Sequence, residues 1–291
     1  MQLTRAPAAH LRPFVKLLWA SAPEGMPTER PGAREHVLPT GGMHLVFRLS
    51  GPPLKLFGGT DDAQGRTHGY AIVGGARAAF YTRDVSVATR SVGAQLQPGA
   101  ARALLGAPED ALASQHTPLD ALWGAQQADA ALEQLHAAGD LKRQLETFEA
   151  LLTQRIVTSL GAGLHGLHPA IASTLGPLAR ENPSIAGLVT RSGYSHRRFI
   201  AIFRGAIGLS PKEYARVMRF DRALALAADP ARSWVDIALT AGYSDQAHLS
   251  REFSALAGML PQAWRQTGAA SPRHVPATVA SAAAGQIRSR R

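Results

Sequence analysis

The sequence predicts an α+β protein, with an antiparallel β domain at the N-terminus and an all-α domain of two helix-turn-helix units at the C-terminus. Three observations lead to this prediction. Short runs of alternating apolar residues fill about the first hundred positions, a helical period replaces them from Pro98, and one motif occurs twice near the C-terminus. The chain has 291 residues. Because domains usually hold ~100–200 residues, two domains are expected.

The first half carries the β signal. Residues 43–49 (MHLVFRL) alternate apolar and polar side chains, residues 85–97 are rich in β-branched residues, and GYAIVGG lies between them. Turn sequences such as SGPP and FGGTDD separate these runs. Short strands at regular spacing with such turns are typical of an antiparallel barrel or sandwich.

Helical patterns begin at Pro98. The sequences PGAARALLG and PEDALAS predict two short helices. Asp140 is expected to cap a longer helix over residues 141–160, in which Leu, Phe and Ile recur every three or four positions. This apolar stripe predicts packing in the core or, alternatively, contact with a second subunit.

Residues 161–169 (GAGLHGLHP) interrupt the helical pattern and predict a linker. The linker separates a domain of residues 1–160 from a helical domain of residues 170–267. Three linker glycines fit G-x-G-x-x-G, but a dinucleotide-binding fingerprint needs a strand before it and a helix after it, so we interpret the match as chance. The tail of residues 268–291 is rich in Ala, Ser, Pro and Arg and is predicted to be disordered.

Positive charge is concentrated in the C-terminal part. Residues 1–169 contain 15 Lys and Arg against 14 Asp and Glu, whereas residues 170–267 contain 12 against 7. Residues 268–291 add four Arg and no acidic residue, and the whole chain has a net charge of +10. This asymmetry predicts a polyanion as the partner of the C-terminal part, and the alternative is a basic surface without a partner.

Several classes of chemistry have no support in the sequence. The absence of cysteine excludes disulfides, thiolate metal sites and a cysteine nucleophile. No H-E-x-x-H, P-loop or G-x-S-x-G motif occurs, and His36, His44 and His68 lack the H-x-H and glutamate pattern of metal-binding cupins. We therefore expect no enzyme activity, no cofactor and no metal site.

The sequence also contains no membrane signal. Its longest apolar runs are far shorter than the ~20 residues that span a bilayer. The N-terminal residues lack the continuous apolar core of a signal peptide. These observations predict a soluble, cytoplasmic protein without a membrane partner.

The repeated motif predicts two helix-turn-helix units. RSGYSHRRFIAIFRGAIGLSP and TAGYSDQAHLSREFSALAGMLP both place Gly-Tyr-Ser ahead of an apolar run that ends in Gly-x-x-Pro. Each copy predicts a short helix, a turn at Gly193 or Gly242, and a second helix capped by Ser195 or Ser244. The alternative is a helical repeat with no role in DNA binding.

The outward side chains of each second helix suit a major groove, in which Arg reads guanine and Gln reads adenine. In the first unit they are His196, Arg197, Arg198, Ala201 and Arg204. In the second unit they are Gln246, Ala247, Ser250 and Arg251. Between the units, Arg216, Arg219 and Arg222 recur at a spacing of three. These arginines predict phosphate contacts or, alternatively, a solvated helix face.

The last hundred or so residues resemble the DNA-binding domain of the AraC/XylS family of bacterial transcription regulators. The segments that carry the resemblance are IAGLVTRSGYSHRRFIAIFRGAIGLSPKEYARVMR and DIALTAGYSDQAHLSREFSALAGMLPQAWR. The resemblance implies sequence-specific promoter binding with one helix of each unit in a major groove. It places Arg197, Ile200 and Ala201 at base-facing positions of the first unit, and Gln246, Ala247, Ser250 and Arg251 at those of the second. Ala201 departs from the larger polar or basic residue that is frequent there.

The N-terminal half resembles the uncharacterised, sensor-like domain that precedes some DNA-binding domains of this family. RPFVKLLWA, EHVLPTGGMHLVFRL and GAQLQPGAARALLGAPEDAL carry this resemblance. It implies a small, cupin-like β-barrel with appended helices, which serves as an effector pocket, a dimerisation surface or both. The implied partners are promoter DNA, a small-molecule effector, RNA polymerase and a second copy of the chain.

Two other functions compete with this interpretation. The first is a non-specific DNA-binding protein without effector control, and the second is an enzyme domain fused to a DNA-binding module. Some DNA-repair proteins join the same DNA-binding domain to a cysteine that accepts methyl groups. The absence of cysteine excludes that arrangement here.

Overall fold

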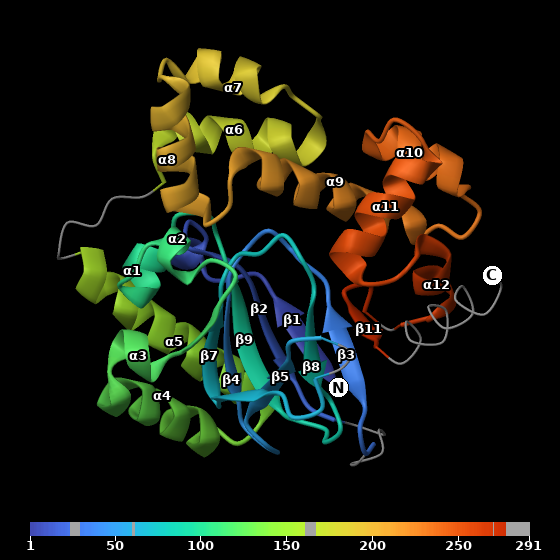
Figure 1. The fold of residues 1–291 in the computed structure, drawn as a ribbon. Coiled ribbons are helices and arrows are strands. Elements are labelled where there is room, and N and C mark those ends of the chain that lie inside the picture. The colour runs from blue at the N-terminus through green and yellow to red at the C-terminus, as the bar shows by residue number, and fades with distance from the viewer. Residues whose placement is uncertain (24–29, 60–61, 161–166, 270, 278–291) are drawn as a thin grey trace.

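The computed structural model has a β-rich N-terminal domain and a helical C-terminal domain that lies across its upper edge in Figure 1. The structure describes residues 1–23, 30–59, 62–160, 167–269 and 271–277. Most of the expected linker, including the G-x-G-x-x-G match, lies outside the described residues. The α+β class agrees with the prediction.

The N-terminal domain contains two antiparallel sheets, described here as the first and the second sheet. The first sheet has the spatial order β1 (Gln2–Arg5), β2 (Val15–Ser21), β9 (Ser91–Leu96), β4 (His44–Arg48), β7 (Ala71–Gly74) and β10 (His116–Pro118). The second sheet has the order β11 (His274–Pro276), β3 (Arg34–Val37), β8 (Tyr81–Asp84), β5 (Leu54–Phe57) and β6 (Arg66–Gly69). A 3-10 turn at Ala9–Leu11 connects β1 to β2.

Helices cover one face of the first sheet (Figure 1). They are α1 (Ala101–Leu105), α2 (Glu109–Leu112), α3 (Asp120–Trp123), α4 (Ala125–Ala137) and α5 (Leu141–Leu160). Asp140 caps α5, because its carboxylate accepts a hydrogen bond from Arg143 N at 2.9 Å. The apolar stripe of α5 packs on β2 and β9. The ring centroid of Phe148 lies 5.7 Å from that of Phe47 on β4. Core packing is therefore the alternative that the structure bears out for this stripe.

The predicted barrel needs correction. Within the described residues, no ladder joins β1 or β10, the edges of the first sheet, to β11 or β6, the edges of the second. A closed barrel requires every edge strand to find a neighbour from the other sheet. Here the outer edge of β3 pairs instead with β11, which comes from the C-terminal tail. The domain is therefore a pair of packed sheets rather than a closed barrel.

The tail itself is a second correction, because part of it is ordered on the N-terminal domain. Strand β11 pairs with β3 in antiparallel register, so that His274 lies opposite Val37. Leu38 N donates a hydrogen bond to Arg273 O at 2.9 Å, and Val275 is fully buried. The composition of the tail predicted disorder, but burial of Val275 and pairing with β3 stabilise this part of it. Residues 278–291 lie outside the described part of the chain.

The C-terminal domain is all-α up to residue 267. Its helices are α6 (Pro169–Arg180), α7 (Ile185–Ser192), α8 (His196–Ile207), α9 (Pro211–Ala227), α10 (Trp234–Ala241), α11 (Gln246–Ala257) and α12 (Pro261–Gln266). Helix α9 begins with a capping box, in which Glu213 N donates to Ser210 Oγ and Ser210 N donates to the Glu213 carboxylate. No helix in the described part of the chain has the length and apolar character needed to cross a bilayer.

Candidate nucleic-acid interface

The first unit of the repeat folds into a helix, a glycine turn and a second helix. Ser184 precedes α7, and its hydroxyl accepts a hydrogen bond from Gly187 N at 3.1 Å. Helix α7 ends at Gly193, whose φ is 71°. Ser195 precedes α8, and its hydroxyl accepts from Arg198 N at 3.4 Å. The turn and the cap lie at the positions that the sequence predicted.

The second unit repeats this geometry with one difference. Helix α10 ends at Gly242, whose φ is 93°. The cap of α11 is Asp245 rather than the predicted Ser244, because Asp245 Oδ1 accepts from His248 N at 2.6 Å. This hydrogen bond lowers the pKa of Asp245, and a carboxylate at this position interacts favourably with the positive end of the helix dipole. Ser244 directly precedes this cap, and its Oγ lies 3.0 Å from His248 Nδ1.

Replacing Gly193 with valine is expected to lower the free energy of unfolding by about 2 kcal/mol. A left-handed conformation costs ~1–2 kcal/mol for a residue with a Cβ, and a β-branched side chain adds to this cost. No atom lies within 4 Å of a Cβ built at Gly193, so backbone strain alone causes the loss. Urea unfolding followed by circular dichroism measures it. Gly193→Asn is the control, because Asn tolerates this conformation better, and equal midpoints for the two variants would contradict the explanation.

The inward faces of α8 and α11 are buried aromatic and aliphatic side chains. Phe199, Phe203 and Ile207 of α8 are buried, as are Leu249 and Phe253 of α11. This packing fixes which side of each helix reaches solvent. The outward faces are therefore set by the cores of the two units.

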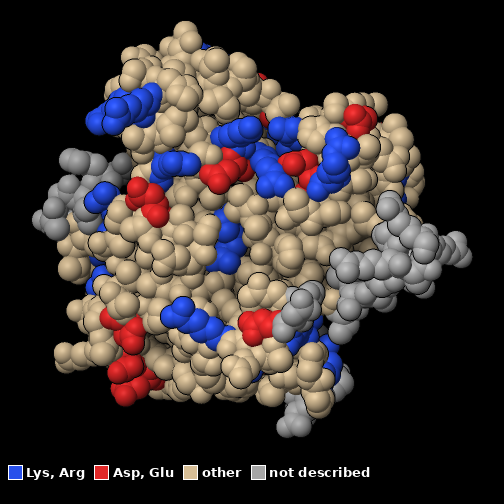
Figure 2. All heavy atoms as spheres, viewed as in Figure 1, with Lys and Arg blue, Asp and Glu red and all other residues tan. Residues whose placement is uncertain are grey.

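The residues that the sequence assigned to DNA lie mainly on the solvent side. In α8, the exposed ones are His196, Arg197, Arg198, Ala201 and Arg204, and Ile200 is half-buried. In α11, the exposed ones are Gln246, Ala247 and Arg251, and Ser250 is half-buried. Figure 2 shows Lys and Arg side chains gathered on the face that α8, α9 and α11 share, with acidic side chains between them.

The arginines of α9 make contacts within the protein. Arg216 Nε lies 2.5 Å from the Glu252 carboxylate of α11. The Arg219 guanidinium lies 5.3 Å from the ring centroid of Tyr243. Both side chains are half-buried, and their contacts with phosphates stay a prediction.

Arg222 is a structural residue that the sequence did not identify as such. Its Nη1 donates to Ala179 O of α6 at 2.9 Å, and its Nη2 donates to Ala241 O of α10 at 3.1 Å. The guanidinium therefore joins the carboxyl end of α6, which precedes the first unit, to that of α10 in the second unit, where the helix dipole favours a cation. Its spacing of three from Arg219 gave no signal for this role.

Comparisons with known proteins agree with this architecture. Residues 188–267 match a family model described as a helix-turn-helix domain, and residues 3–118 match a domain of unknown function (DUF6597). Over 86 residues the chain is 38% identical to the HTH-type transcriptional regulator YkgA of Escherichia coli. This match covers 29% of the chain and 36% of YkgA.

Two solved structures are also similar. One is ToxT from Vibrio cholerae, with a TM-score of 0.47 and 10% identity over 91% of this chain and 98% of ToxT. The other is the transcriptional regulator CdpR from Pseudomonas aeruginosa, with a TM-score of 0.31 and 19% identity over 62% of this chain and 46% of CdpR. Another ToxT structure contains a bound unsaturated fatty acid.

Proposed function

We propose that this chain, an AraC-type regulator whose helix-turn-helix domain follows a domain of unknown function, binds specific promoter sequences and regulates transcription. AraC-type regulators are not enzymes. The observation that carries the proposal is the pair of capped helices α8 and α11, each buried on one side and basic or amide-bearing on the other. We call α8 and α11 the recognition helices.

Each recognition helix enters one of two successive major grooves on one face of the DNA. Helix α9 connects the two units with 17 residues, which is about 25 Å at ~1.5 Å per residue. Successive major grooves on one face are ~34 Å apart. Because a short, stiff connector favours neighbouring grooves, the target is one compact site, and DNA bending accommodates the remaining mismatch.

Within each groove, the long polar side chains near the start of the recognition helix read bases. Arg197 and Arg251 suit guanine, and Gln246 suits adenine. Small side chains such as Ala201 and Ala247 allow the helix to approach the bases closely. Arg204 lies further along α8 and suits a phosphate.

The experiment that tests this function is in vitro selection of random duplex DNA by the purified full chain. The expected result is a consensus in two segments about one helical turn apart. The symmetry of the consensus reports whether one chain or two occupies the site. A non-specific binder would give no consensus, and the logarithm of its affinity would fall with the logarithm of salt by ~0.9 per neutralised phosphate.

Replacing Arg197 or Arg251 with alanine is expected to weaken binding to the selected site by about 1–3 kcal/mol and to relax preference at one base pair. The reason is that a bidentate contact to guanine is lost while the phosphate contacts remain. Fluorescence anisotropy on the selected site and on single-base variants measures both effects. Arg143→Ala is the control, since Arg143 is exposed on α5 of the N-terminal domain. Equal weakening on every sequence would instead make these residues phosphate contacts.

The proposal includes an effector that binds between the two sheets of the N-terminal domain. Polar side chains face each other there: Tyr81 of the second sheet lies 4.5 Å from the ring of His116 of the first, and Arg77 Nη2 lies 3.2 Å from His116 Nδ1. Burial lowers the pKa of His44, which shares this face, to about 4 and keeps it neutral. A shift in the melting temperature of the full chain with one class of small molecule tests this part. An unsaturated fatty acid is the first probe.

A further inference from the structure

The C-terminal end of α8 rests on the N-terminal domain, at a contact that we call the first seat. Helix α8 ends at Gly208, where a Cβ would lie 3.0 Å from Glu109 O and 3.2 Å from Ala76 Cβ. Gly99 N also donates a hydrogen bond to Ala206 O at 2.9 Å. Ala76 follows β7, and Gly99 follows β9. The first seat therefore belongs to the first sheet and to the helix α2 beside it.

The C-terminal end of α11 rests on the other sheet, at the second seat. Helix α11 ends at Gly258, where a Cβ would lie 2.6 Å from Phe80 Cζ and 2.8 Å from the His36 ring. His36 Nδ1 donates to Ala257 O at 3.1 Å, and burial lowers the pKa of His36. His36 lies on β3, and Phe80 directly precedes β8. The second seat therefore belongs to the second sheet.

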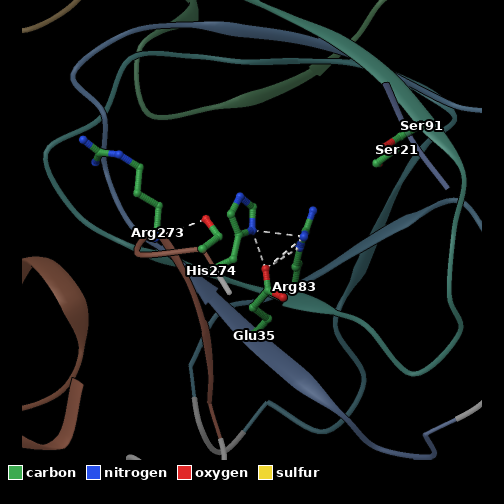
Figure 3. Close-up of polar contacts among 7 residues, drawn as sticks. Ser21, Glu35, Arg83, Ser91, Arg273 and His274 are labelled. Atoms are coloured by element: carbon green, nitrogen blue, oxygen red, sulfur yellow. Dashed lines mark hydrogen bonds and ion pairs between the residues drawn. The ribbon is translucent and has the colours of Figure 1, made fainter. Parts of the chain in front are cut away.

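Residues 273–276 of the tail, which include β11, form a strap between α9 and the second sheet. His274 Nδ1 lies 2.5 Å from Glu35 Oε1, and Arg83 Nη2 lies 2.9 Å from the same atom. Arg273, one residue earlier, pairs with Asp221 of α9. Figure 3 shows Glu35, Arg83 and His274 meeting beside Arg273. Helix α11 is thus tied to the second sheet at the second seat, and the connecting helix α9 is tied to it through the tail.

We infer that the relative position of the two sheets adjusts the distance between the recognition helices about the connecting helix α9, because each recognition helix rests on a different sheet. The sheets are joined at one edge, where β6 continues through Tyr70 into β7 and His68 Nδ1 lies 3.2 Å from His116 O. No ladder joins them into a closed barrel in the described residues, so a relative shift of the sheets breaks no strand pairing. A ligand between the sheets then changes the spacing of the half-sites that the protein binds. This change in half-site spacing rests on the proposed function. The link between the position of the sheets and the distance between α8 and α11 does not.

The first test measures the coupling without DNA. Because the chain has no cysteine, Ala186→Cys on α7 and Thr240→Cys on α10, both exposed positions, place one spin label on each unit. Double electron–electron resonance then gives the distribution of distances between the units. Gly258→Ala is expected to broaden or displace this distribution, because its methyl group overlaps with Phe80. Gly193→Ala is the control, since its φ is similar and nothing lies within 4 Å.

A second pair of variants leaves the recognition helices intact. Arg273→Ala removes the link between the strap and α9, and it is also expected to broaden the distribution. Arg232→Ala is its control, because the Arg232–Asp229 ion pair is local and exposed. Unchanged distributions for both Gly258→Ala and Arg273→Ala would overturn the inference, whatever the protein does on DNA.

The second test uses the half-sites from the selection, joined by spacers of the selected length and of one or two base pairs more or fewer. Wild-type protein is expected to prefer one spacer. Gly258→Ala and Arg273→Ala are expected to reduce that preference about fivefold or more, the lower end of typical coupling between sites. An unchanged spacer preference would overturn the inference while leaving the proposed function intact. A selection without a consensus would overturn the proposed function instead, and the spin-label distances would still decide the inference.

Discussion

Arg222→Ala is expected to lower the free energy of unfolding of the C-terminal domain by about 3 kcal/mol. The side chain donates to Leu178 O and Ala179 O at the end of α6 and to Ala241 O at the end of α10. Hydrogen bonds to charged groups contribute ~1.5–3 kcal/mol each, and water compensates part of the loss at this half-buried position. Urea unfolding followed by far-ultraviolet circular dichroism measures the change.

Two further variants distinguish the hydrogen bonds that Arg222 makes to α6 and α10 from a general effect of its charge. Arg222→Lys keeps the cation but presents a single ammonium, which does not span carbonyl groups on two helices, and we expect it to recover less than half of the loss. Arg232→Ala removes an exposed ion pair, and we expect a change below ~0.5 kcal/mol. If Arg222→Ala and Arg232→Ala gave similar midpoints, the hydrogen bonds that Arg222 makes to α6 and α10 would make no contribution to stability.

The parts of the molecule that the sequence predicted well depend on contacts between near neighbours. The hydroxyl of Ser195 meets a backbone N–H three residues later, and the left-handed turn at Gly193 depends on one residue. Such features follow from residue type and spacing. The one local error, Ser244 in place of Asp245, arose because both residues are good caps and stand next to each other.

The parts that the sequence did not reveal depend on distant residues. Arg222 bonds to Leu178, 44 residues away, and His274 meets Glu35 across 239 residues. Nothing in the neighbourhood of either residue records these partners. The same limit explains why the prediction of a closed barrel was wrong, because nothing in the tail sequence indicates that it pairs with the edge of β3. The base-facing role that the resemblance gives to Ile200 also depends on contacts with DNA, and it stays a prediction.

Long-range contacts matter more for this protein than for an isolated DNA-binding domain. Each recognition helix ends on the N-terminal domain through a glycine, Gly208 or Gly258, that leaves no room for a side chain. A rearrangement in the N-terminal domain would therefore reach the proposed DNA-binding surface through direct contact. The stability of the first seat depends in turn on α2 and on its buried acid, Glu109.

Glu109→Gln is expected to stabilise the protein at pH 8 by about 3 kcal/mol and to leave it unchanged at pH 4. Burial raises the pKa of Glu109 from 4.5 to about 7, against the hydrogen bond that its carboxylate accepts from Ala101 N at 2.9 Å. Between pH 4.5 and 7 the folded state holds a proton that the unfolded state lacks. The contribution of Glu109 to the free energy of unfolding therefore decreases as pH rises through this window, by ~1.4 kcal/mol per pH unit.

The difference between wild type and Glu109→Gln isolates this effect, because every other titrating group, including His44, is present in both proteins. Urea midpoints at pH 5, 6, 7 and 8 give that difference, and we expect it to grow from pH 5 to pH 7 and to level off by pH 8. Glu133→Gln is the control, since Glu133 is exposed on α4. A difference that stayed flat across this range would mean that the folded protein keeps Glu109 ionised. In that case the hydrogen bond from Ala101 and the nearby charge of Arg102 would outweigh the cost of burial, and the first seat would be insensitive to pH.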